Sequence, residues 1–311
     1  MILLTSQPQI EQTGAVEPTK AAPALRIGWI RQPGVVSLFL LSPDLLWIGL
    51  FLAGPLFLLG QISLHLYVPG EGIRTVFEFG NYARVLTDSL FHRVLANTLY
   101  LAAWVTAMCA LLGFPLAIVL VRARGLARVM LYFAIVIPLL TSAVVKTFGW
   151  TILLSNRGVI NQMLVGLGVT DAPVKLMYTL TGAVIALTQV LLPFMTLALA
   201  ASLENIDPAI YEAARNLGGR SARVFFRITL PLSLPGLVSG AVLVFTLAVS
   251  AYVTPRLVGG PTVKVMSVAI YEQAIVLLNL PLGASLSFLL LLIVLLLFVG
   301  TLRLARPRVA A

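Results

Sequence analysis

The sequence predicts an all-α integral membrane protein with six transmembrane helices, and three observations support this fold class. The chain has 311 residues, of which 59% are hydrophobic and 10% are charged, and its mean hydropathy is +1.02. The chain also contains long uncharged segments, and Lys and Arg are distributed unevenly between the segments that connect them. A soluble globular domain has an apolar share of only about 45–50%, so the composition excludes that class of protein.

Five uncharged segments are each at least as long as the roughly 20 residues that a helix needs to cross the hydrocarbon layer. They are residues 45–64, 94–121, 176–203, 228–255 and 273–302. A sixth apolar segment, residues 129–155, contains one charge, Lys146. We expect prolines to kink or end these helices where neighbouring helices satisfy the freed backbone groups. These prolines are Pro115, Pro138, Pro193 and Pro235.

Lys and Arg are enriched in the short cytoplasmic segments of membrane proteins. In this chain they concentrate before the first span, in the turn at residues 122–128, in a polar insert at residues 204–230, and after the last span. We therefore expect both termini, the turn and the insert to lie in the cytoplasm. The formal net charge of +10 then reflects topology and does not indicate a nucleic-acid partner.

The two ends of the chain are expected to be tails. Within residues 1–35, the stretch from Gln7 to Pro23 is rich in Gln, Pro, Thr and Ala without apolar periodicity, and no cleavable signal pattern occurs. We interpret them as a flexible cytoplasmic N-terminal tail and residues 306–311 as a short cytoplasmic C-terminal tail. Residues 36–305 then form the transmembrane domain, in which Cys109, the single cysteine, is expected to serve in packing.

The polar insert begins with a predicted amphipathic helix. Asp207 is expected to cap its N-terminus, and Pro208 suits the first helical position because its missing N–H would have no partner there. The apolar residues recur at the i, i+3, i+4, i+7 spacing that forms one stripe. They are Ile210, Ala213, Ala214 and Leu217, while Glu212, Arg215 and Asn216 fall on the opposite side.

Glycines are expected to end this helix and turn the chain. Gly218 and Gly219 supply a left-handed C-cap, and Gly218 in particular permits a turn with positive φ. Ser221 is expected to cap a second short helix that runs toward Pro231. The insert is thus predicted to form two short helices joined by glycine.

Six polar or aromatic residues in or near the spans are candidates for lining a translocation pathway. They are Lys146, Trp150, Gln189, Ser250, Tyr252 and Thr254. Alternatives stay open, because interhelical hydrogen bonds of about 0.6 kcal/mol account for the polar groups. Interfacial packing accounts for Trp150 and Tyr252, and snorkelling accounts for Lys146. Pro255, at the end of the fifth span, predicts a broken segment at which we expect an outer gate.

Three functional classes can be compared on the sequence. The pattern G-x-x-x-x-G-K-[ST] does not occur, so we expect no nucleotide site on this chain. A membrane enzyme would need an intramembrane metal or acid-base constellation, and a secondary transporter usually needs midplane carboxylates or histidines, or an inverted repeat. We find none of these features in the sequence, so we expect no enzymatic activity, metal or cofactor on this chain. A transporter subunit powered by another protein is favoured, with a secondary transporter of a small polar solute as the alternative.

The insert also resembles a known signature. Glu212-Ala213-Ala214, three residues, Gly218, nine residues, Ile228, one residue and Leu230-Pro231 resemble the signature loop of permease subunits of binding-protein-dependent ABC importers. The remaining chain, roughly residues 38–304, is similar to the spermidine/putrescine branch of these permeases. The segments that carry this likeness are Phe79-Gly80-Asn81-Tyr82, Pro138-Leu139-Leu140, Lys146-Thr147-Phe148-Gly149-Trp150, Val253-Thr254-Pro255 and Leu257-Val258-Gly259-Gly260.

This resemblance implies a type I ABC importer (MetI-like) fold in the bacterial inner membrane. The first helix of the insert would be a coupling helix that contacts an ABC ATPase dimer, which would hold ATP and Mg. The residues that would transmit the motion are Glu212, Ala213, Ala214, Arg215 and Gly218. A second homologous permease would complete a heterodimer, and a periplasmic substrate-binding protein would deliver a polyamine or related small polar amine, with an amino-acid-like substrate as the alternative.

Overall fold

The structure is a computed structural model that describes the backbone of residues 33–217 and 219–305. The predicted tails lie outside the described residues, except that residues from Pro33 onward already belong to a helix. Residues Met1–Pro55 and Leu56–Ala311 form two compact units.

The first unit is helical where it is described. α1 (Pro33–Ile48) is followed by a π-helical turn, η1 (Gly49–Ala53), and by the start of α2 (Gly54–Ser63), which carries the chain into the second unit. The segment Leu41–Ser63 is long and apolar enough to cross a membrane. The first predicted span is confirmed in length and composition, although its helix begins earlier than predicted.

A short β-hairpin follows α2. β1 (His65–Val68) and β2 (Gly72–Phe77) pair antiparallel. Gly70 and Gly72 each have a φ of 90°, a conformation that residues with a Cβ atom rarely adopt. The prediction of an all-α protein missed this hairpin, because strands of four and six residues give no long periodic signal. α3 (Gly80–Thr87) then leads to the central helices.

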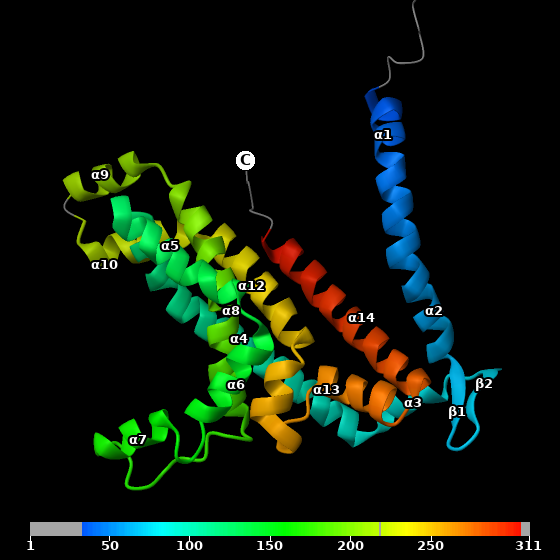
Figure 1. The fold of residues 1–311 in the computed structure, drawn as a ribbon. Helices are drawn as coiled ribbons and strands as arrows, with labels where there is room; N and C mark the ends of the chain where they lie inside the picture. Colours follow the sequence, from blue (N-terminus) through cyan, green and yellow to red (C-terminus); the bar gives the residue numbers. More distant parts are fainter. Residues whose placement is uncertain (1–32, 218, 306–311) are drawn as a thin grey trace, which may run out of the picture. The chain divides into compact units, whose positions relative to one another are not determined.

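Three long helices form the centre of the second unit. α4 (Ser89–Arg122), α8 (Leu180–Glu204) and α12 (Leu234–Ser250) pack against one another (Figure 1). Gly240 allows α12 to approach α8 closely, because a Cβ atom at this position would lie 2.8 Å from Met195 Sδ and 3.2 Å from Ala198 Cβ. Small residues at helix contacts are typical of packing in lipid. Pro115 and Pro193 lie inside α4 and α8 without ending them.

The segment predicted as the third span is divided into two helices. α5 (Gly125–Leu140) and α6 (Ala143–Leu153) meet at an angle of 99°. Pro138 stands in the last turn of α5, and Ser142 Oγ caps α6 by accepting a hydrogen bond from the Val144 N–H at 3.3 Å. The prediction that Pro138 would kink or end this span is confirmed, since α5 ends two residues after it and Ser142 begins a new helix.

The segment predicted as the fifth span is also bent. α10 (Ser221–Val224), the π-helical turn η2 (Phe225–Thr229) and α11 (Leu230–Leu232) run at 63° to α12. Pro235 lies in the first turn of α12, as expected for a proline that starts a helix. Within the described residues, four helices are long and apolar enough to span a membrane, or up to six if each bent pair counts as one span.

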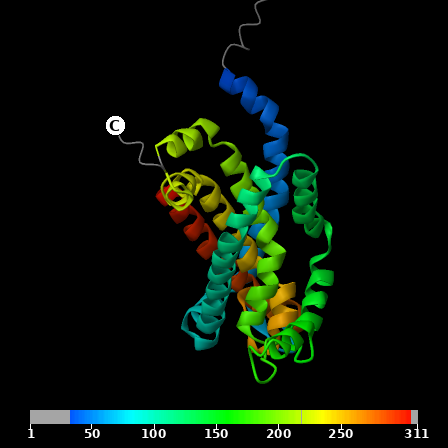
Figure 2. The same cartoon turned by 90° about the vertical axis from the view of Figure 1, so that its left-hand side faces the viewer.

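The remaining helices lie toward the two ends of the bundle. α9 (Pro208–Asn216) and α10 lie at one end, which we call the α9 end, and α7 (Val159–Gly166) lies at the other, the α7 end (Figures 1 and 2). After α12 the chain forms the short turns η3 (Pro255–Gly259) and η4 (Gly260–Thr262), then α13 (Met266–Tyr271) and η5 (Glu272–Val276). α14 (Leu280–Ala305) is the last helix.

Candidate functional site

The predicted N-terminus of the insert helix is confirmed. Asp207 Oδ1 accepts a hydrogen bond from the Ala209 N–H at 2.9 Å, and Pro208 is the first residue of α9. At the other end, Leu217 N–H donates to the Ala213 carbonyl at 3.1 Å and Gly219 N–H donates to the Ala214 carbonyl at 2.9 Å. The helix thus begins with a side-chain cap, and the carbonyls of Ala213 and Ala214 near its end are partnered.

α9 packs on the bundle by a different face than the apolar stripe. Tyr211 packs against the hydrophobic core and Ala214 is half-buried. Ile210, Ala213 and Leu217 are exposed, with Leu217 88% accessible. These three residues share one helical face by their spacing of three and seven residues. We call them the exposed stripe of α9, an apolar surface that no other described residue of this chain covers.

The glycine turn after α9 depends on close approach. A Cβ atom on Gly219 would lie 2.7 Å from the Ala214 carbonyl oxygen and 3.1 Å from Val224 Cγ2. Close packing thus explains the glycine at position 219. Gly218 and the side chain of Arg215, both predicted coupling residues, lie outside the described residues.

The second arm of the insert differs from its prediction. Ser221 is the first helical residue of α10 rather than its cap, and no side chain caps that helix. The arm is held by Phe225 instead, whose ring meets the Phe114 ring of α4 at a centroid distance of 5.3 Å, edge to face. Edge-to-face aromatic pairs add about 0.5–1.5 kcal/mol beyond their buried area. Tyr211 and Phe225 therefore anchor both arms to the bundle.

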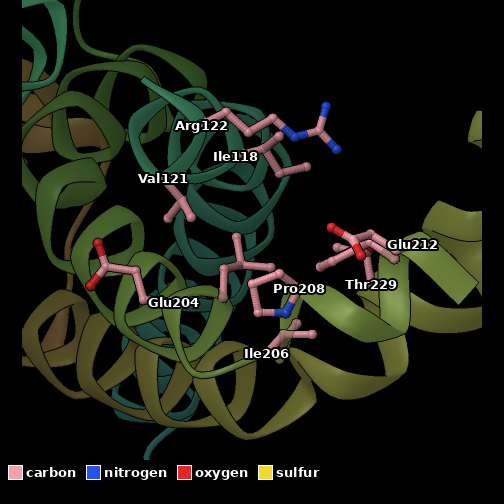
Figure 3. A pocket seen from close by; sticks show the side chains of 10 residues that line it. Ile118, Val121, Arg122, Glu204, Ile206, Pro208, Glu212 and Thr229 are labelled. Carbon is pink, nitrogen blue, oxygen red and sulfur yellow. The ribbon is translucent and has the colours of Figure 1, made fainter. Parts of the chain in front are cut away.

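A pocket of about 390 Å³ lies between α9 and the ends of α4 and α8 (Figure 3). Its lining consists of Ile118, Val121, Arg122, Leu203, Glu204, Ile206, Pro208, Tyr211, Glu212 and Thr229. Glu204 also forms an ion pair with Arg128 of α5. Glu212, a predicted coupling residue, is exposed beside this pocket, with Arg122 on the facing helix.

Four of the candidate lining residues lie on or against α6. The Trp150 indole N–H donates a hydrogen bond to Gln189 Oε1 at 3.1 Å, which joins α6 to α8. Thr147 and Thr254 share a hydrogen bond at 3.0 Å, and Thr254 is buried. Lys146 Nζ donates to the Pro138 carbonyl oxygen at 2.9 Å. Each of these groups thus has a partner within the chain.

The two other candidates have different partners. Ser250 is exposed, and its Oγ donates to carbonyl oxygens of its own helix, those of Thr246 and Leu247, both at 3.1 Å. The ring of Tyr252 packs against the ring of Tyr271 at a centroid distance of 4.8 Å. The structure thus gives Ser250 and Tyr252 partners on α12 and α13, whereas hydrogen bonds join Trp150 to Gln189 and Thr254 to Thr147 on α6.

A charged group at the α7 end was not predicted from the sequence. Glu272 Oε1 pairs with Arg256 at 2.9 Å and Glu272 Oε2 pairs with Lys264 at 3.0 Å. The three residues lie in η3, in the connection before α13, and in η5. No sequence spacing marks them as neighbours, because the broken segment after α12 is what folds them together.

The chain matches a known protein family. Residues 110–308 match the family described as binding-protein-dependent transport system inner membrane component. The chain is 34% identical over 241 residues to the spermidine/putrescine transport system permease protein PotB of Salmonella typhimurium (strain SL1344), covering 78% of this chain and 84% of that protein. The identity to PotB of Escherichia coli (strain K12) is 33% over 241 residues, covering 78% and 87%.

A solved structure supports the same assignment at the level of the fold. A chain of the crystal structure of a bacterial alginate ABC transporter, in complex with an alginate pentasaccharide-bound periplasmic protein, superposes with a TM-score of 0.71 at 18% identity. The superposition covers 90% of this chain and 97% of that chain. The chain belongs to the family of binding-protein-dependent transport system inner membrane components.

Proposed function

We propose that this chain is one of two permease subunits in an ATP-driven importer, and that α9 docks on a partner ATPase subunit. The observation that carries this proposal is the exposed stripe of α9. A polar insert that needed only to cover the bundle would bury Ile210 and Leu217, yet both are exposed while Tyr211 holds the opposite face. An exposed apolar surface of this kind is typical of a protein interface.

The anchoring of both arms supports a role in transmitting motion. α9 is fixed at its start by Asp207 and on its inner face by Tyr211, and the following arm is fixed to α4 by Phe225. Packed elements move between discrete arrangements rather than deforming continuously. A displacement of α9 by the ATPase would therefore reach α4 directly, and Glu212 offers a charge to a basic rim on that partner.

The orientation and the other partners follow from the same proposal. The enrichment of Lys and Arg at the α9 insert and at the ends of the chain favours a cytoplasmic α9 end, with the α7 end facing the periplasm. A periplasmic binding protein would deliver substrate there, and a second homologous permease would complete a heterodimer. The PotB relatives, named as spermidine/putrescine permeases, support a polyamine or related small amine as substrate.

The docking of α9 can be tested on the assembled complex. Leu217→Asp should abolish co-purification with the ATPase subunit, because a carboxylate in an apolar contact loses its hydration without gaining a partner. Leu167→Asp is a matched control, since Leu167 is 78% exposed at the α7 end. Co-purification of the Leu217→Asp permease at the wild-type level would rule out this docking surface.

The energy source can be tested on the wild-type complex. Putrescine uptake in proteoliposomes should require ATP hydrolysis and should continue after ion gradients are collapsed. Uptake that stops when the ion gradients are collapsed and that does not depend on ATP would instead support a secondary transporter.

A further inference from the structure

The charged group at the α7 end is built around a single carboxylate. Glu272 uses one oxygen for the Arg256 guanidinium and the other for the Lys264 ammonium, at 2.9 and 3.0 Å. The side chain of Glu272 is 24% exposed, and those of Arg256 and Lys264 are 40% and 42% exposed. Both cations therefore reach solvent, while the carboxylate between them is the more enclosed member.

Two tyrosines lie in the same turns as the charged group. Tyr271 directly precedes Glu272 in the chain, and its ring packs on that of Tyr252 at 4.8 Å. Tyr252 lies one helical turn before Arg256, whose backbone N–H donates to the Tyr252 carbonyl oxygen at 3.0 Å. Tyr271 is 38% exposed, so the pair presents part of its aromatic surface to solvent.

A carboxylate beside tyrosine rings is a combination that binds ammonium groups. The carboxylate supplies a charge-assisted hydrogen bond, and an aromatic face attracts a cation within about 6 Å of its centre. Lys264 carries a primary ammonium, the same group found at the ends of a polyamine. In this structure the Lys264 ammonium thus pairs with the Glu272 carboxylate, and the proposed substrate would bring the same kind of ammonium group.

We propose that Glu272, together with Tyr252 and Tyr271, forms a transit site for a primary ammonium group of the substrate, and that Lys264 occupies this site when substrate is absent. The inference rests on the proposed function and deepens it by assigning the amine a site on this chain. Arg256 holds the second oxygen of Glu272 and keeps the carboxylate in position while the ammonium groups exchange.

The exchange keeps Glu272 paired with an ammonium group, which makes it feasible at a partly exposed site. The incoming ammonium replaces another ammonium, so Glu272 is compensated before and after. Lys264 returns to water on a flexible stem, and exposed ion pairs of this kind contribute little to stability. No proton transfer or covalent step is required.

The site can be tested by equilibrium dialysis of radiolabelled putrescine against the permease–ATPase complex in nanodiscs, without binding protein. Lys264→Met removes the internal competitor, and we expect putrescine to bind roughly two- to fivefold more tightly, as expected from the modest strength of an exposed pair. Glu272→Gln removes the anion, and we expect binding to be lost. Glu71→Gln is the matched control, because Glu71 forms an exposed ion pair with Arg74 on the hairpin.

The outcomes separate this site from a purely structural clamp. A clamp predicts that Lys264→Met lowers the melting temperature of the complex without tightening putrescine binding. Failure of Lys264→Met to tighten binding overturns the proposal, even where Glu272→Gln proves poorly assembled. ATP-dependent putrescine uptake by the wild-type complex with its binding protein tests the proposed function separately, since uptake can persist without this transit site.

Discussion

Lys146 caps the carbonyl of Pro138 across the break between α5 and α6, with Nζ donating a hydrogen bond of 2.9 Å. The last carbonyls of a helix have no partner within the helix, and a cation near them is favoured by the helix dipole. The charge that stands out within the third predicted span thus has a local structural role. That Lys146 lines a translocation pathway stays a prediction, since a lysine that caps a helix can also border a pathway.

Replacing this lysine should weaken the broken span. In Lys146→Met the Pro138 carbonyl keeps only the Thr141 N–H, at 3.3 Å, as a donor, and we expect a loss of about 1 kcal/mol in stability. Lys146→Arg should recover most of it, because arginine can donate to the same oxygen. Thermal melting of the purified complex measures the effect, with the exposed Lys175→Met as control. Equal melting of Lys146→Met and wild type would contradict the capping role.

The hydrogen bond between Trp150 and Gln189 allows a test of the lining hypothesis. Gln189→Leu leaves the indole N–H without its acceptor, and Trp150→Phe leaves the amide without its donor, so each should cost about 1 kcal/mol. The double variant should cost less than the sum of the two, as coupled neighbours do. If Gln189 also lines the pathway, Gln189→Leu should slow putrescine uptake more than Trp150→Phe does. Equal uptake by both variants would indicate that the hydrogen bond has only a structural role.

The contact between Phe114 and Phe225 should be needed for coupling. Phe225→Ala removes the edge-to-face pair, worth about 0.5–1.5 kcal/mol beyond buried area, and frees the second arm from α4. We expect the complex to assemble and hydrolyse ATP while uptake falls severalfold. Phe133→Ala is the control, since Phe133 is 54% exposed on α5. Parallel losses of hydrolysis and uptake in Phe225→Ala would argue against transmission through this contact.

Replacing a glycine by alanine should have opposite effects on stability at Gly240, where α12 approaches α8 closely, and at Gly149 in α6, which is not crowded. Gly240→Ala places a Cβ atom 2.8 Å from Met195 Sδ, and overpacking of this kind costs about 1–3 kcal/mol. Gly149→Ala meets no atom within 4 Å and should be neutral or slightly stabilising, because alanine is the better helix former. Melting temperatures of the two complexes decide the matter. A neutral Gly240→Ala would show that the two helices can separate without cost.

Much of the α9 site could be predicted because it is local. The N-cap at Asp207, the proline at the first position and the apolar spacing all lie within one short segment, where sequence and helical geometry determine one another. What could not be predicted was which face of α9 turns inward. Tyr211 faces the core while Ile210 and Leu217 face outward, and that choice depends on the surfaces of α4 and α8.

The sequence by itself determined that this chain lies in a membrane, where its spans fall, and where a capped polar helix interrupts them. These properties follow from hydrocarbon thickness, hydropathy and capping, which act over a few to some twenty residues. Only the tertiary structure decided the 99° angle at the break between α5 and α6, the pairing of the hairpin after α2, and the meeting of Arg256, Lys264 and Glu272. The reason is physical: hydropathy and capping determine where helices begin and end, but the angle between two helices and the partner of a charged side chain depend on how the elements pack.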